Sequence, residues 1–317
     1  MVVGSVKGRG RVEAGGVEHG GGYAGREMQT LAEIRALLEG AGLSPRKALG
    51  QNFLIDKNLV GKLIDACGPA AGSVVLEVGP GTGTLTGELL ARGLRVVACE
   101  LDRGLAELLR QTLGAGEHAG RFALVEGDCL PDRRHVHPEA VAAVERALAD
   151  AGAERFMLIA NLPYAAATPL MLSLLIHHPR CVRLGVTIQK EVAGRLLAKP
   201  GTKEYGLLGI VAQAMAEVEL VANLPPECFW PRPDVTSAMV LLKRRERPLT
   251  TDPAGLAGLC QRLFSQRRKQ LGSILGRGLM EGSGIDPILR PEALSVEQLI
   301  ALAAYVGRTS TSTPDAE

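Results

Sequence analysis

The stretch LEVGPGTGTLT, residues 76–86, places glycines between an apolar run and the start of a helical pattern. Gly79, Gly81 and Gly83 allow the backbone to turn sharply and approach a ligand, and the helix that follows presents unpaired N–H groups. A dinucleotide-binding fingerprint has a further glycine where this chain has Thr84. The stretch therefore predicts a ligand-binding strand, turn and helix, but it does not choose the ligand.

Apolar runs alternate with helix-like segments after the glycine turn. This alternation indicates an α/β fold with a mainly parallel sheet, because parallel strands need long crossover connections. Two later runs, 216–224 and 236–245, are joined by a proline-rich loop without a helix, which predicts an antiparallel hairpin at one sheet edge. The earlier runs are SVVLEVG (73–79), RVVACE (95–100), FALVEGD (122–128), RFMLIANL (155–162) and RLGVTIQ (183–189).

The rest of the pattern divides the chain into four parts. Residues 1–28 are rich in glycine and lack apolar periodicity, which predicts a disordered tail. The α/β pattern occupies 29–246. Leucines then recur at helical spacing, so we expect a small helical domain over 247–307. Residues 308–317 are expected to form a flexible tail.

Composition indicates a soluble cytoplasmic protein. With 46% hydrophobic and 22% charged residues, the chain can fill a large core. The six cysteines lack the spacing of a zinc site, so we expect reduced thiols and no metal ion. The uncharged segment 156–179 resembles a membrane span, but Pro163 and Pro169 argue against one.

Two acidic residues end consecutive strands of the predicted sheet. Glu100 follows Gly79 by 21 residues, where a carboxylate can accept hydrogen bonds from both hydroxyls of a ribose. Asp128 ends the next strand at the same edge, where it can accept from an adenine amine. Together with the glycine turn, these acids predict a site for an adenosine-containing cofactor. In the alternative interpretation they only cap the segments that follow.

The tetrapeptide NLPY, residues 161–164, ends the fourth strand. The Asn161 side-chain oxygen and the Leu162 carbonyl can both accept from an exocyclic amine, while Pro163 fixes the turn and Tyr164 can stack on a base. Such positioning directs the amine lone pair at an electrophile, and a sulfonium methyl fits that role. The alternative is an asparagine turn whose tyrosine packs on the core.

Positive charge is concentrated late in the chain. Residues 243–280 contain nine Lys or Arg against two acidic residues, although the whole chain has a net charge of only +2. Beside a base-modifying site, this cluster predicts contacts to RNA phosphates, and a solvated helix face is the alternative. The residues assigned to RNA are Arg244, Arg245, Arg267, Arg268 and Lys269.

Taken in order, seven motifs resemble the ribosomal RNA small-subunit adenine dimethyltransferase family. They are KALGQNFLID (47–56), VLEVGPGTGTLT (75–86), ELD (100–102), GD (127–128), NLPY (161–164), FWPRPDVTSAMV (229–240) and FSQRRKQL (264–271). The resemblance spans about 29–307. It implies a Rossmann-like class I fold, with S-adenosyl-L-methionine as cofactor and a small C-terminal helical domain. It also implies dimethylation at N6 of two adjacent adenines in the 3′-terminal hairpin of small-subunit rRNA, by a monomer acting on the immature 30S particle.

Matching motif positions imply the site residues. The cofactor site would be lined by Asn52, Leu54, Gly79, Glu100, Asp128 and Asn161. The catalytic turn would be Asn161, Leu162, Pro163 and Tyr164. Phe229 would cover the other face of a flipped adenine opposite Tyr164. Alternatively, Phe229 and Trp230 pin a proline-rich loop to the core. Where the family usually has Asn-Ile-Ser-Thr-Pro after NLPY, this chain has Ala-Ala-Ala-Thr-Pro.

Three other functions remain open at this point. A related methyltransferase of large-subunit rRNA usually carries isoleucine at the position of Leu162. An assembly factor would act by binding immature ribosomal subunits. A nicotinamide-dependent oxidoreductase would share the glycine turn and Glu100, but it leaves NLPY and the basic helices unexplained.

Overall fold

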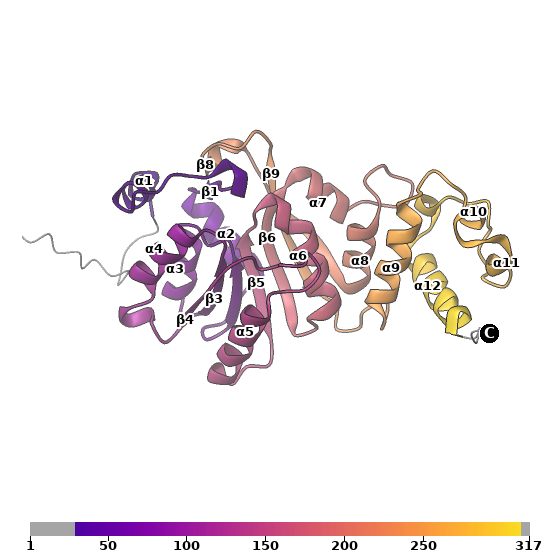
Figure 1. The fold of residues 1–317 in the computed structure, drawn as a ribbon, viewed down its shortest axis with the longest axis horizontal. Helices are drawn as coiled ribbons and strands as arrows, with labels where there is room; N and C mark the ends of the chain where they lie inside the picture. Colours follow the sequence, from indigo (N-terminus) through magenta and orange to yellow (C-terminus); the bar gives the residue numbers. More distant parts are fainter. Residues whose placement is uncertain (1–28, 312–317) are drawn as a thin grey trace, which may run out of the picture.

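A central sheet of seven strands organises residues 29–311, the part of the chain that the computed structural model describes (Figure 1). Its strand order is β4-β3-β2-β5-β6-β9-β7. Strands β2 to β6 are parallel, and β9 pairs antiparallel with both β6 and β7, which confirms the mainly parallel sheet and the edge hairpin. The strands are β2 (Val74–Val78), β3 (Arg95–Glu100), β4 (Phe122–Glu126), β5 (Phe156–Asn161), β6 (Cys181–Gln189), β7 (Ala216–Leu224) and β9 (Ser237–Arg244).

Helices cover both faces of this sheet, and each face has its own apolar core. Alternate strand residues point to opposite faces, so Val74 and Leu76 join one core while Val75 joins the other. Burying each such side chain contributes about 1.5–3 kcal/mol. One face carries α2 (Lys57–Cys67), α3 (Thr84–Ala91) and α4 (Arg103–Leu113), and the other carries α5 (Pro138–Ala151), α6 (Tyr164–His177), α7 (Lys190–Leu196) and α8 (Leu207–Met215).

A small second sheet holds the N-terminal segment near the glycine turn. Helix α1 (Leu31–Gly40) begins with a capping box, and the 3-10 turn η1 (Lys47–Leu49) leads into β1 (Phe53–Leu54). Strand β1 pairs antiparallel with β8 (Phe229–Trp230), which follows the 3-10 turn η3 (Pro226–Cys228). The Trp230 ring lies 6.3 Å from that of Phe53, which fits the pinning role considered for Trp230.

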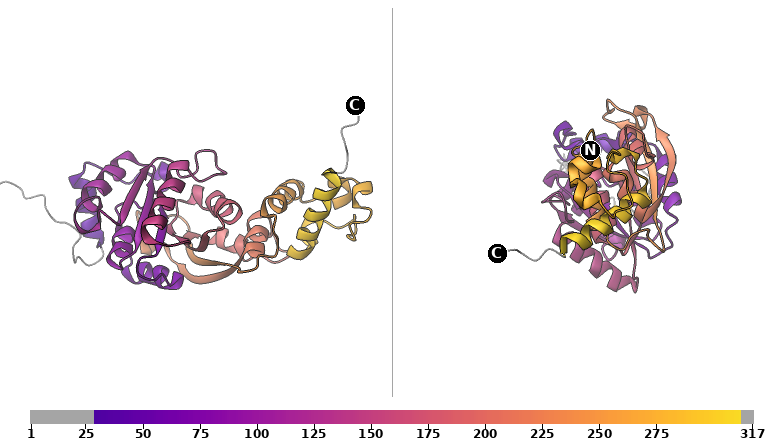
Figure 2. Two further views of the ribbon diagram at one scale, coloured as in Figure 1. Left: turned by 90° about the horizontal axis from the view of Figure 1, so that it is seen from below. Right: turned by 90° about the vertical axis from the view of Figure 1, so that its right-hand side faces the viewer.

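The C-terminal helices extend away from the sheet and give the molecule its long axis (Figures 1 and 2). They form a third core with residues of α8, around Tyr205, Ile210 and Leu256. Helical structure after residue 247 agrees with the prediction, but the domain boundary itself stays a prediction. The helices are α9 (Pro253–Phe264), α10 (Leu271–Leu275), α11 (Arg277–Met280) and α12 (Val296–Thr311), and the remaining 3-10 turns are η2 (Gly116–His118) and η4 (Pro291–Ala293).

The ends of the chain differ in part from expectation. Helix α12 continues to Thr311, so residues 308–311 are helical where a flexible tail was expected. Within this last turn, Thr309 Oγ1 donates to the carbonyl of Tyr305 at 3.2 Å. The tail expected at 1–28, and residues 312–317 of the tail expected at 308–317, lie outside the described residues.

The apolar segment 156–179 contains β5 and the whole of α6, and Pro169 lies inside that helix. Within residues 29–311, every helix is too short or too polar to traverse a bilayer.

Candidate active site

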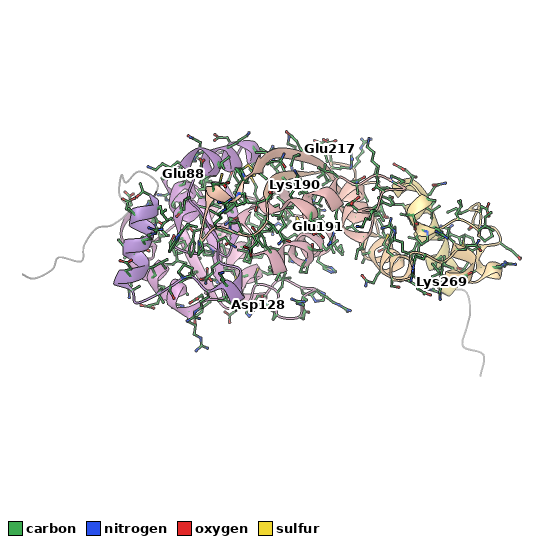
Figure 3. The ribbon with its side chains drawn as sticks, turned by 90° about the horizontal axis from the view of Figure 1, so that it is seen from above. Glu88, Asp128, Lys190, Glu191, Glu217 and Lys269 are labelled. Carbon is green, nitrogen blue, oxygen red and sulfur yellow. The ribbon has the colours of Figure 1, made fainter. Side chains whose placement is uncertain are left out.

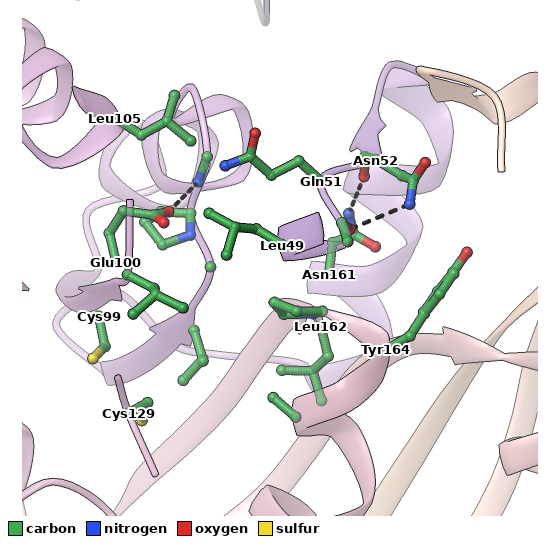
Figure 4. Close-up of a pocket in the computed structure, with 18 of the residues that line it drawn as sticks. Leu49, Gln51, Asn52, Cys99, Glu100, Leu105, Cys129, Asn161, Leu162 and Tyr164 are labelled. Atoms are coloured by element: carbon green, nitrogen blue, oxygen red, sulfur yellow. Dashed lines mark hydrogen bonds between the residues drawn. The ribbon is translucent and has the colours of Figure 1, made fainter. Parts of the chain in front are cut away.

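A cavity of about 500 Å³ opens at the carboxyl ends of β2, β3, β4 and β5 (Figure 4). In open α/β sheets this edge is where ligands bind, because the loops that follow the strands converge there. The structure brings together every residue predicted for the cofactor and the target base. These are Asn52, Leu54, Gly79, Glu100, Asp128, Asn161, Leu162, Pro163, Tyr164 and Phe229.

Two positions of the glycine turn, Gly79 and Gly81, leave no room for a side chain. Gly79 and Gly81 have φ values of 72° and 62°, in the left-handed region. A Cβ at Gly79 would lie 3.0 Å from the Pro163 ring, and a Cβ at Gly81 would lie 2.7 Å from the Phe53 ring. The turn therefore leaves room for the backbone to cradle a ligand, and it packs directly on the NLPY segment.

Glu100 is fixed at the end of β3 by backbone donors. Its side chain is 5% exposed, and its two carboxylate oxygens accept from Gly81 N at 3.1 Å and Asp102 N at 2.9 Å. Burial raises the pKa of Glu100, and these two N–H groups oppose that rise. Each oxygen keeps a lone pair, so the carboxylate can accept from both hydroxyls of a ribose.

The NLPY amide is held in one orientation. Asn161 ends β5, and its Nδ2 donates to the carbonyl of Asn52 at 2.8 Å (Figure 4). The other end of the amide, Oδ1, is then the acceptor available in the cavity. The backbone of Leu162 is tied to β6 by a bond from its N–H to Thr187 O at 3.1 Å. Both expected acceptors thus belong to a rigid turn beside the glycine loop.

Two aromatic side chains line the same cavity. Tyr164 begins α6, and its hydroxyl lies 3.0 Å from Ser237 Oγ. Phe229 is only 3% exposed and packs in the core shared by α2 and α3, so it does pin its loop as the alternative proposed. Its covering of a flipped base stays a prediction.

Residues 42–302 match the family model described as ribosomal RNA adenine dimethylase. The chain belongs to the ribosomal RNA adenine dimethylase family. The ribosomal RNA small subunit methyltransferase A of Mesorhizobium japonicum is 38% identical over 284 residues, covering 87% of this chain and 98% of the relative. The protein of the same name from Moorella thermoacetica is 37% identical over 287 residues, covering 87% and 97%.

Solved structures share this fold. A dimethyladenosine transferase from Plasmodium falciparum gives a TM-score of 0.64 at 24% identity, covering 81% of this chain and 98% of that one. The 23S rRNA methyltransferase ErmE gives 0.56 at 23%, covering 81% and 100%. These findings confirm the expected family and the Rossmann-like methyltransferase fold, and S-adenosyl-L-methionine is the cofactor of this adenine dimethylase, as expected.

The adenine dimethylase site contains acidic and amide groups that the sequence analysis did not single out. Glu77 is 1% exposed and accepts from Thr86 Oγ1 at 2.7 Å. Burial raises the pKa of Glu77 to about 8, the hydrogen bond from Thr86 opposes that rise, and the charge of Glu100 adds a smaller increase. The sequence feature that could have identified Glu77 is an acidic residue within an otherwise apolar, buried strand.

Asp102 and Gln51 tie the segment before β1 to the end of β3. Gln51 Nε2 donates to Asp102 Oδ2 at 3.1 Å, while Asp102 Oδ1 caps α4 by accepting from Gly104 N at 2.9 Å. Gln51 also lines the cavity. Asp128 behaves partly as the capping alternative proposed, since its Oδ1 accepts from Leu130 N at 2.9 Å.

Four of the five arginine and lysine residues assigned to RNA donate hydrogen bonds within the protein, since Lys269 Nζ also donates to Gln266 Oε1 at 3.0 Å. Arg244 donates to carbonyls at the end of α6 and the start of β6, which favours a structural role over its assignment to RNA. Arg245 donates to Gln213 O at 3.2 Å, and Arg267 donates to Thr202 O at 2.7 Å. Arg268 and Lys269 are exposed, and Lys269 lies on the helical end of the molecule, far from Asp128 (Figure 3). The carbonyls that bind Arg244 are those of Leu174, Leu175, His178 and Cys181.

We expect Glu100→Gln to weaken binding of S-adenosyl-L-methionine by about tenfold or more, because hydrogen bonds to a charged acceptor contribute roughly 1.5–3 kcal/mol. The amide would also set an NH₂ group against Gly81 N–H or Asp102 N–H. Titration calorimetry measures the dissociation constant. Glu126→Gln is the matched control, since Glu126 pairs with Glu100 in the sheet register but is exposed. Equal affinity in the two variants would contradict the assigned role of Glu100.

Proposed function

We propose that this enzyme transfers methyl groups from S-adenosyl-L-methionine to N6 of two adjacent adenines in the 3′-terminal hairpin of small-subunit rRNA. The observation that carries the proposal is the Asn161 amide, held by Asn52 O at the cavity that also contains the glycine turn and Glu100. The names of the relatives from M. japonicum and M. thermoacetica support the choice of small-subunit rRNA. We further propose a cytoplasmic monomer that acts on the immature 30S particle.

The residues of the site act by positioning. An adenine amine is a poor nucleophile, because its lone pair is delocalised into the ring. Asn161 Oδ1 and the Leu162 carbonyl each accept a hydrogen bond from the N–H groups of the amine. These hydrogen bonds favour the geometry in which the nitrogen lone pair leaves the ring plane. Pro163 provides no N–H that would compete, and Tyr164 stacks on the base. The bound cofactor supplies a methyl group on a positively charged sulfur.

Incubation of the purified enzyme with immature small subunits and methyl-labelled S-adenosyl-L-methionine tests the proposal. Nucleoside mass spectrometry of the rRNA is expected to find N6,N6-dimethyladenosine at two adjacent positions of the 3′-terminal hairpin. Isolated large-subunit rRNA serves as the parallel substrate. Labelling of large-subunit rRNA in place of the hairpin would support the large-subunit activity instead, and no labelling of either would reject both.

Charge reversal at the exposed basic positions tests the RNA surface. We expect the double variant Arg268→Glu, Lys269→Glu to bind small subunits more weakly, and the slope of its salt dependence should fall by about one for each phosphate that is no longer neutralised. The rate at saturating substrate should change little. Affinity is measured by filter binding over a series of salt concentrations. Lys62→Glu is the control, because Lys62 is exposed and belongs to α2, a helix away from the C-terminal helices (Figure 1). Equal losses in both proteins would count against a specific surface.

A further inference from the structure

A side-chain hydrogen bond joins Tyr164, the last residue of the NLPY turn, to Ser237 at the start of β9. Tyr164 Oη lies 3.0 Å from Ser237 Oγ, and Ser237 is fully buried with 0% of its surface exposed. We propose that Ser237 is a positioning residue for methyl transfer, whose hydroxyl holds the Tyr164 ring in the orientation that receives the adenine. This inference rests on the proposed function of the enzyme.

Ser237 is suited to act as a fixed point. It begins β9, which lies between β6 and β7 in the sheet, and it pairs with Gln189 on one side and Leu224 on the other. The neighbouring residue Thr236 accepts a backbone hydrogen bond from Lys190 N at 3.0 Å. With the backbone held on both sides, only one side-chain torsion remains to place the hydroxyl.

Tyr164 has few other groups that could fix its ring. It follows Pro163 at the start of α6, and the next three residues, 165–167, are alanines without polar side-chain atoms. Among the described residues, no aromatic ring stacks on Tyr164. The ring is half-buried and lines the cavity, so a swing about its torsions would change the surface offered to a base. The bond to Ser237 restricts that swing.

Ser237 also pairs with Leu224 at the two ends of the segment that contains Phe229, the second aromatic residue of the cavity. The pair between Leu224 and Ser237 joins the two ends of segment 225–236, which contains Phe229 in β8. Ser237 therefore contacts Tyr164 through its side chain and fixes the end of the Phe229 segment through its backbone. Loss of the Tyr164–Ser237 hydrogen bond is expected to affect how the target adenine is held, and not how the RNA or the cofactor binds.

The chain offers a matched control in Ser173 on α6, the helix that Tyr164 begins. Ser173 is 2% exposed, and its hydroxyl has no hydrogen-bond partner among the described residues. Ser173→Ala thus removes a buried hydroxyl without removing a bond. The kcat of Ser173→Ala shows the effect of removing a buried oxygen atom alone, and the kcat of Ser237→Ala shows the additional effect of removing a hydrogen bond.

A double-mutant cycle tests the inference with Ser237→Ala, Tyr164→Phe and their combination, assayed for methyl transfer to immature small subunits. We expect each single variant to lower kcat about three- to tenfold. The double variant should be no slower than the slower single variant, because the two substitutions remove the same hydrogen bond. KM for the particles and the affinity for S-adenosyl-L-methionine should stay within about twofold. Ser237→Thr, which keeps the hydroxyl, should be faster than Ser237→Ala.

The outcomes separate this inference from the proposed function. An inactive wild-type enzyme would reject the proposed function. An active wild type whose kcat is unchanged in Ser237→Ala, or whose losses multiply in the double variant, would reject only the role of Ser237. A lowered melting temperature with unchanged kcat would show a purely structural bond and would also overturn the inference. If Ser237→Ala fails to fold, Tyr164→Phe tests the same hydrogen bond, because it removes the Tyr164 hydroxyl and keeps the ring; an unchanged kcat in that variant would reject the role of Ser237.

Discussion

Replacing Asn161 by alanine is expected to lower the rate of methyl transfer by roughly 10²- to 10³-fold, the range found when one group that stabilises a transition state is removed. The variant loses one of the two acceptors for the adenine amine, and it also loses the bond to Asn52 O that holds the turn. Single-turnover transfer of labelled methyl to small subunits measures the chemical step without product release. A rate within about threefold of wild type would exclude Asn161 from the reaction.

Two companion variants make this result specific. Asn161→Asp keeps an acceptor, but its carboxylate would face the carbonyl of Asn52 where the amide now donates, so we expect most of the loss to remain. Asn223→Ala on β7 is the control, because Asn223 is an exposed asparagine and does not line the cavity. Full activity of Asn161→Asp would show that an oxygen acceptor alone is sufficient and that the orientation by Asn52 is dispensable.

The meeting of the site residues in one cavity could be predicted from the sequence, because the topology of a parallel sheet determines where the strand ends lie. Glu100, Asp128 and Asn161 are far apart in the chain, but each lies at or just beyond the carboxyl end of a parallel strand. Parallel strands place those ends at one edge, so recognising the strands was enough to bring the residues together. The left-handed φ of Gly79 and its close approach to Pro163 then explain why this position of the turn tolerates no side chain.

The small sheet of β1 and β8 could not be predicted in the same way. Each strand has only two residues, which is too short for an alternating pattern to be visible. What holds them is contact between distant segments, such as the stacking of Phe53 on Trp230 and the Arg35 guanidinium 5.1 Å above the Trp230 ring. Sequence spacing carries no information about such pairs.

The sequence of the basic cluster does not show which of its members bind within the protein. Clustering along the sequence counts charges but does not show which buried acceptors they meet. The end of a helix leaves carbonyls without partners, and β9 brings Arg244 directly to those at the end of α6. Its guanidinium has five N–H donors in a fixed fork, a geometry suited to several carbonyls at once. The charge that suggested RNA binding at this position therefore stabilises the fold.

Arg244→Ala is accordingly expected to lower the free energy of unfolding by about 3 kcal/mol, since hydrogen bonds from a charged donor contribute roughly 1.5–3 kcal/mol and the carbonyls it leaves are half-buried. Arg244→Lys should restore only part of this, because a single ammonium cannot bridge the carbonyls of Leu174 and Cys181 together. Urea denaturation measures the change, with exposed Arg268→Ala expected within about 0.5 kcal/mol of wild type. RNA affinity per folded molecule should be the same in Arg244→Ala and wild type. Weaker RNA binding at unchanged stability would return Arg244 to the RNA surface and would mean that the α6 carbonyls are satisfied by water.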